Sequence, residues 1–148
     1  MTLAFIIDEN VFIWAHTLDP DSQALQLLRD IDVLGHVIAV TTQTYRQYSV
    51  QADHFAEQAL GPETAFRVIR RLLAEGRVLF FADERVPPVA DEERLPEDDL
   101  VFVRLAAHVG GVLVTTDNPL RERIEEARGL PLRVVSVQEA LLIAQSEA

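Results

Sequence analysis

Residues 99–118 read DLVFVRLAAHVGGVLVTTDN, a stretch that holds a helical pattern, a stop signal and a buried strand in succession. Apolar residues recur at helical spacing between Val101 and Val109, and an acidic pair precedes them as a helix cap. Two glycines end that pattern, and the apolar run 112–114 that follows is typical of a strand buried on both faces. A helix that leads into such a strand predicts a parallel sheet.

Four other short apolar runs have the same character, and helical patterns lie between them. The runs span residues 3–7, 37–40, 78–81 and 133–135. The helical patterns span residues 22–31, 42 to about 60, 62–76, 118–127 and 136–144, with Asp21 or Ser22, Pro62 and Ser136 as start signals. This alternation predicts a three-layer α/β/α fold around a mainly parallel sheet of about five strands. Residues 82–97, rich in proline and acid, are predicted to form a surface loop.

Length and composition restrict the class of protein. With 148 residues, 49% of them hydrophobic, the chain fits one compact domain, 1–148. It shows no signal peptide and no apolar run near the roughly 18 residues that cross a bilayer, so we expect a soluble cytoplasmic protein that binds no membrane. The absence of cysteine excludes thiol chemistry. A formal charge of −11 argues against a broadly basic nucleic-acid surface, yet acids can also gather around a divalent cation.

Acidic residues follow two of the predicted strands and open one helix. Asp8 comes directly after the first strand, Asp117 after the fourth, and Asp99 begins the helix that leads into the fourth. Ligands of parallel sheets gather outside the carboxyl ends of the strands, so we expect these three carboxylates to converge there. Hard oxygen ligands of this kind suit Mg²⁺ or Mn²⁺. The sequence therefore predicts a metal site at this edge.

Polar neighbours of these acids are candidates for a supporting role. Asn10 and Thr116, together with Thr115, are predicted to orient the carboxylates or a metal-bound water. Glu9, one residue out of phase with Asp8, is predicted to point to solvent or to cap the following turn. Taken singly, each of the acids also fits the plainer interpretation of a helix cap.

Two stretches resemble the PIN-domain ribonucleases, the family that includes the VapC toxins of bacterial toxin–antitoxin pairs. IIDENVFIWA, residues 6–15, resembles the family's opening Asp-x-Asn-hydrophobic signature. Residues 99–118 resemble its Asp-helix-Gly-strand-Thr-x-Asp segment, with Asp99 and Asp117 at the separation that the family shows. The resemblance implies a PIN-like fold whose metal ligands are Asp8, Asp99 and Asp117.

The resemblance also implies an activity and partners. It implies a Mg²⁺- or Mn²⁺-dependent endoribonuclease that leaves a 5′-phosphate and a 3′-hydroxyl, with Asn10 and Thr116 as positioning groups beside the three aspartates. For a toxin of this kind, we expect a small basic antitoxin protein that covers the acidic site, and a homodimer.

One position departs from the family pattern. Members of the family carry a glutamate in the helix after the second strand, and Gln47 is at the corresponding position here. We keep Gln47 among the catalytic candidates, although an uncharged amide binds Mg²⁺ more weakly and cannot act as a base. Gln43 and Gln51 share its helix face. Asp53 and Glu57, farther along, are alternative acids.

Other residues and functions stay open. The predicted RNA contacts are Arg46, Arg67, Arg70 and Arg71, for which a solvated charged face is the plainer interpretation. The four histidines show no paired spacing and are predicted to be structural or exposed. Besides the ribonuclease, the sequence admits a PIN-like binding module that has lost turnover, favoured by Gln47, and a metal-dependent phosphohydrolase that acts on small esters.

Overall fold

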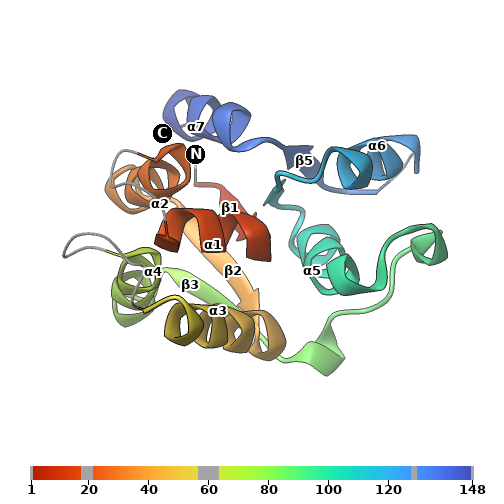
Figure 1. Ribbon diagram of the computed structural model, residues 1–148. Coiled ribbons are helices and arrows are strands. Elements are labelled where there is room, and N and C mark those ends of the chain that lie inside the picture. The colour runs from red at the N-terminus through yellow and green to blue at the C-terminus, as the bar shows by residue number, and fades with distance from the viewer. Residues whose placement is uncertain (1, 18–21, 57–63, 128–129, 148) are drawn as a thin grey trace.

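The computed structural model describes residues 2–17, 22–56, 64–127 and 130–147. Five strands form one sheet in the order β3-β2-β1-β4-β5, and all neighbouring pairs are parallel (Figure 1). The strands are β1 (Ala4–Ile7), β2 (Val37–Thr41), β3 (Val78–Phe81), β4 (Val112–Val114) and β5 (Arg133–Val135). The predicted α/β class, the parallel sheet and the number of strands are confirmed.

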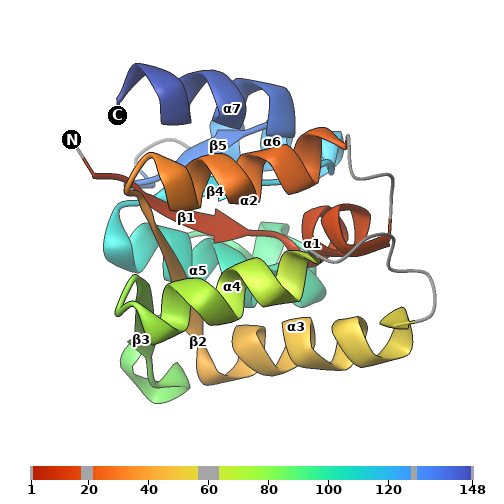
Figure 2. The ribbon, with the colours of Figure 1, turned by 90° about the vertical axis from the view of Figure 1, so that its left-hand side faces the viewer.

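Helices cover both faces of this sheet, as the alternating pattern predicts. They are α1 (Glu9–Thr17), α2 (Gln23–Val33), α3 (Thr42–His54), α4 (Ala65–Ala74), α5 (Leu100–Val109), α6 (Asn118–Glu126) and α7 (Val137–Ser146). Helices α2, α4 and α7 lie on one face, and α5 and α6 lie on the other (Figures 1 and 2). Helix α3 packs against β2 and α1 near the carboxyl ends of the strands. No helix among the described residues is long and apolar enough to span a membrane.

Side-chain caps fix the helix starts. Ser136 and Glu139 form the predicted capping box of α7, and Ser22 caps α2. Gly110 ends α5 at a φ of 64°, a left-handed conformation that glycine adopts without strain. The alternative cap Asp21 and the signal Pro62 lie outside the described residues. Helix α3 ends at His54, with Phe55 as its C-cap, so the prediction that it continues to about residue 60 is wrong.

Helix α1 is the element that the sequence patterns do not predict. Its first residue follows β1 after Asp8 alone, and its apolar side chains Val11, Phe12 and Ala15 are buried. Because this helix carries apolar residues on most of its sides, it lacks the polar stripe that is typical of a surface helix. The predicted loop at 82–97 does lie on the surface, with three short 3₁₀ turns.

Two polar side chains, the half-buried Arg77 and the buried His36, tie the elements together at the amino ends of the strands. Arg77, just before β3, donates from Nη2 to the carbonyl oxygens of Ile31, Asp32 and His36 at 2.7–2.9 Å. His36 accepts the backbone N–H of Leu3 at Nδ1 (3.0 Å), and its Nε2 lies 2.8 Å from the carbonyl oxygen of Ala144. The neutral ring thus accepts at Nδ1 and donates at Nε2, so this histidine is structural, as predicted.

Candidate active site

Asp8 is held rigidly at the carboxyl end of the central strand. Its backbone N–H donates to the carbonyl oxygen of Val114 on β4 (3.0 Å), which extends the sheet pairing by one residue. The side chain is only 3% exposed. Its Oδ1 accepts the backbone N–H of Glu9 and its Oδ2 accepts the hydroxyl of Thr115, both at 2.8 Å. The carboxylate is therefore oriented before any ligand arrives.

Asp117 is connected to Asp8 by Thr115, which forms a hydrogen bond with each of them. Its backbone N–H donates to Thr115 Oγ1 at 3.1 Å, and its own Oδ1 accepts the backbone N–H of Leu120 at 3.0 Å as the cap of α6. The plainer interpretation of Asp117 as a helix cap is thus correct, and it holds together with a place at the acidic edge. The buried hydroxyl of Thr115 links both aspartates.

Asp99 completes the convergence that the sequence predicts. It occupies the N-cap position of α5, yet its side chain makes no capping hydrogen bond. Burial, followed by the charges of Asp8, Asp117, Asp98 and Glu9 in that order, raises the pKa of Asp99 to about 6. The three predicted aspartates are therefore close enough to interact electrostatically. We name Asp8, Asp99 and Asp117 the acidic edge.

Burial and neighbouring charge also act on Asp8. Its pKa is raised above the ordinary value, chiefly because burial disfavours the charged form. The hydrogen bonds from Thr115 and the Glu9 backbone oppose this shift, and the charges of Asp117 and Glu9 add to it. The acidic edge thus holds carboxylates under mutual repulsion, a state that a cation relieves.

In the absence of metal, this repulsion predicts that Asp99 contributes less to stability as the pH rises from about 4 to about 6. Because the folded-state pKa of Asp99 is about 6, above its ordinary value of 3.8, the folded state binds the proton more tightly. The stabilisation is complete below the unfolded pKa and is lost as the pH rises through about 6. The pKa of Glu92, which the bond from Arg104 lowers to about 2, and the pKa of His16, which burial lowers, act in the opposite sense, so the comparison with Asp99→Asn isolates this contribution. Urea unfolding in EDTA measures the fall, and an equal fall in Asp99→Asn contradicts the assignment.

The donor chemistry of the acidic edge fits a hard divalent cation. Its donors are carboxylate oxygens, the ligands that Mg²⁺ and Mn²⁺ prefer. Among the described residues, no group of three or more His, Asp or Glu side chains is close enough to hold a metal ion as it stands. Mg²⁺ usually keeps several waters and uses one or two carboxylates directly, so this spacing suits a cation held partly through water.

A cavity of about 440 Å³ opens beside the acidic edge. It is lined by Glu9, Gln43, Gln47, Glu97, Asp98, Leu100, Val101 and Arg104. The side-chain oxygen Oε1 of Gln47 is buried and has no hydrogen-bond partner. The next residue, Tyr48, is fully buried and donates its hydroxyl to the carbonyl oxygen of Ile7, which fixes this turn of α3 against β1. Gln47 therefore lines this cavity, which none of the three aspartates lines, and its role in a site stays a prediction.

The sequence predicts that Glu9 points into solvent or caps the following turn, and the structure places it differently. Its Oε1 accepts a hydrogen bond from Gln51 Nε2 at 2.6 Å, and it lines the cavity. Arg104, which sequence reasoning does not select, lines the cavity as well. It lies five positions after Asp99, which is not the spacing of one helical turn, so no pattern in the sequence points to it. Arg104 also binds Glu92, with Nε 2.8 Å from Oε2.

The remaining candidates are less closely connected to the acidic edge. Asn10 and Thr116 are exposed, and it is Thr115 that contacts Asp8. Of the two alternative acids, Asp53 is exposed on α3 and Glu57 lies outside the described residues.

The predicted RNA-binding arginines are exposed on two helices and do not line the cavity. Arg46 lies on α3, and Arg67, Arg70 and Arg71 lie on α4. Arg71 binds Asp32 of α2 at 2.8 Å. A role of these arginines in RNA binding stays a prediction.

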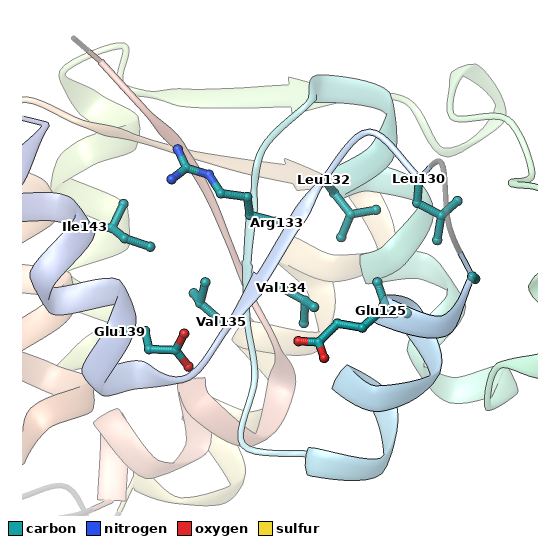
Figure 3. A pocket seen from close by; sticks show the side chains of 10 residues that line it. Glu125, Leu130, Leu132, Arg133, Val134, Val135, Glu139 and Ile143 are labelled. Atoms are coloured by element: carbon teal, nitrogen blue, oxygen red, sulfur yellow. The ribbon is translucent and has the colours of Figure 1, made fainter.

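A separate groove of about 460 Å³ lies along β5, between α6 and α7 (Figure 3). Apolar side chains such as Val134 and Ile143 line it together with Glu125 and Glu139. The groove shares no lining residue with the cavity beside the acidic edge, so it is a distinct feature of the surface.

Comparison with known proteins supports the fold. A solved PilT N-terminus domain protein from the hyperthermophilic archaeon Sulfolobus solfataricus P2 is similar, with a TM-score of 0.56 and 13% sequence identity. The match covers 96% of this chain and 93% of that chain. No protein-family model matches the sequence, and no curated protein sequence matches it. At this identity the likeness bears on the fold alone, and the chain has a PIN-like fold with an all-parallel five-stranded sheet.

Proposed function

We propose that this protein is a divalent-metal-dependent endoribonuclease of the PIN type. The observation that carries the proposal is the convergence of Asp8, Asp99 and Asp117 at the carboxyl edge of a PIN-like sheet. Parallel sheets bind their ligands at this edge. Carboxylates that repel one another lower the stability of the fold, so their presence together indicates a functional site. The adjoining cavity gives room for part of a polynucleotide.

In this proposal the three aspartates hold Mg²⁺ or Mn²⁺. When bound, the metal lowers the pKa of a bound water and neutralises charge on the attacked phosphodiester. Thr115 keeps Asp8 and Asp117 in register through its two hydrogen bonds. Asn10 and Thr116, exposed at the same edge, orient the RNA backbone. The products are a 5′-phosphate and a 3′-hydroxyl.

Cleavage of a panel of labelled RNAs tests the proposal. The protein is incubated with Mn²⁺, with Mg²⁺ and with EDTA, and Asp8→Asn serves as the control for contaminating nucleases. Cuts that require metal and vanish in Asp8→Asn are the expected result. Hydrolysis of small phosphate esters without any RNA cleavage would instead identify a phosphohydrolase.

A toxin role and its partners belong to the same proposal. A small basic antitoxin suits a chain of formal charge −11 that carries a cluster of acids at one edge. We also propose a homodimer. Light scattering of the purified chain measures its mass, and co-expression with a small basic protein encoded beside it shows whether the two proteins copurify and whether cleavage is then inhibited.

The second candidate is a PIN-like binding module without turnover, favoured by the neutral Gln47. Gln47→Glu separates the two functions. A large gain of RNA cleavage marks a site that has decayed, whereas little change means that another group already supplies the charge.

A further inference from the structure

The carboxylate of Glu9 is held in a defined place next to the acidic edge. Glu9 follows Asp8 directly and begins α1. Its side chain is half-buried, and its Oε1 accepts the hydrogen bond from Gln51 Nε2, which crosses from α3 to α1 at 2.6 Å. A glutamate that only serves the dipole of a helix start needs no such partner. The contact holds the carboxylate of Glu9 against α3.

Glu9 shares its cavity with Gln47. Both residues line the space of about 440 Å³ beside the acidic edge. Gln47 and Gln51 are one helical turn apart on α3, so the side chain that holds Glu9 neighbours the amide that lines the cavity. The buried oxygen of Gln47 has no donor and carries no full charge. Glu97 and Asp98 also line the cavity but are exposed, whereas Glu9 is half-buried and is held against α3 by Gln51.

Glu9 also belongs to the electrostatic cluster of the aspartates. Its backbone N–H donates to Asp8 Oδ1, and its charge acts on both Asp8 and Asp99. A carboxylate so near two others is repelled by them, and this repulsion would be relieved if the side chain turned outward into solvent. Gln51 holds it inward instead.

We propose that Glu9 is a fourth carboxylate of the metal site and supplies the negative charge that the amide of Gln47 lacks. Glu9 then holds the cation together with Asp8, Asp99 and Asp117, directly or through a bound water. Gln51 is a positioning residue, because it acts through Glu9. The assignment rests on the proposed function only so far as that function needs a divalent cation.

Titration calorimetry with Mn²⁺, without RNA, tests this assignment. The proteins compared are the unaltered chain, Glu9→Gln, Gln47→Glu and the double variant. Glu9→Gln keeps the contact to Gln51 within reach and removes only the charge, and we expect it to weaken Mn²⁺ binding about 10- to 100-fold. Gln47→Glu should gain little alone and should restore most of the affinity in the Glu9→Gln background, since the two carboxylates fill one role.

Two further variants complete the design. Glu125→Gln removes the same charge in the distant groove along β5 and should leave the affinity within about twofold, because exposed charges at long range are screened. Gln51→Ala leaves Glu9 without its anchor and should lower the affinity less than Glu9→Gln does. Thermal unfolding of each variant in EDTA confirms that it is folded.

The outcomes separate this assignment from the nuclease. Unchanged Mn²⁺ affinity in Glu9→Gln, or an equal gain from Gln47→Glu in both backgrounds, overturns the role of Glu9. Absence of Mn²⁺ binding by the unaltered protein overturns the metal site and the assignment together. The expected pattern of affinities in a protein that cuts no RNA supports Glu9 as a ligand and contradicts only the nuclease.

Discussion

The Asp8→Asn variant is expected to lose metal-dependent RNA cleavage by more than about a hundredfold while it keeps or gains stability. Activity falls because the best-ordered carboxylate of the acidic edge becomes neutral. Stability does not fall, since burial and neighbouring charges raise the pKa of Asp8 and so make its ionised form unfavourable in the folded state at neutral pH. Asparagine still offers an acceptor to the Glu9 N–H and a donor to Thr115. Cleavage rates and urea unfolding in EDTA at neutral pH measure the two effects.

Asp53→Asn is the matched control for this variant. It removes the same charge from an exposed position on α3, and we expect cleavage and stability to be unchanged. If Asp8→Asn cleaves RNA at a rate within about threefold of the unaltered protein, the loss is smaller than the tenfold effect that corresponds to one pKa unit. The reaction then takes place elsewhere. If instead Asp8→Asn unfolds at much lower urea, the hydrogen bonds of the carboxylate outweigh its desolvation.

Arg77→Met is expected to lower the free energy of unfolding by about 3 kcal/mol, the value of one or two hydrogen bonds to a charged group. The guanidinium serves three carbonyl oxygens that end α2 and lead into β2, and its Nη1 also binds Asp32 at 3.0 Å. Without it each carbonyl loses one donor in a partly buried turn, and those of Ile31 and Asp32 keep only a backbone N–H. Thermal unfolding should shift down by about 6–12 °C for a chain of this length.

Arg71→Met isolates the contribution of the ion pair. Arg71 binds the same carboxylate of Asp32, but its side chain is 44% exposed. Exposed pairs contribute about 0–1 kcal/mol, so this variant should unfold close to the unaltered protein. Equal losses in Arg71→Met and Arg77→Met would show that the charge of Asp32, and not the carbonyl contacts, is what matters. Arg77→Lys should lose most of the stability as well, because an ammonium lacks the planar fork.

The strands could be predicted closely, and the reason is physical. Parallel strands covered on both faces are continuous apolar runs, so residues 37–40 identify β2 almost to the residue. β3 is also an apolar run, residues 78–81, although its Leu79 and Phe80 are exposed at the edge of the sheet. Helix α1 is hidden because a helix with apolar residues on most of its sides has no clear amphipathic period. The order of strands and helices then sufficed to bring Asp8, Asp99 and Asp117 to one edge.

The contacts within the site could not be predicted in the same way. Which of two adjacent threonines turns toward Asp8 depends on the backbone after β4, and Thr115, not Thr116, makes the contact. The place of Glu9 depends on Gln51, which lies 42 positions away in the sequence. A pattern of residues that are neighbours in the sequence cannot predict a contact with such a distant partner.

The central position of β1 has a consequence for biosynthesis. The strand that carries Asp8 is made first, but it pairs with β2 and with β4, whose Val114 accepts the Asp8 N–H from far along the sequence. A chain emerging from the ribosome at about 5–20 residues per second exposes β1 long before β4 exists. Thr115 and Asp117 follow β4, so the acidic edge assembles only when most of the protein has been translated. A nascent or prematurely ended chain therefore lacks a complete acidic edge.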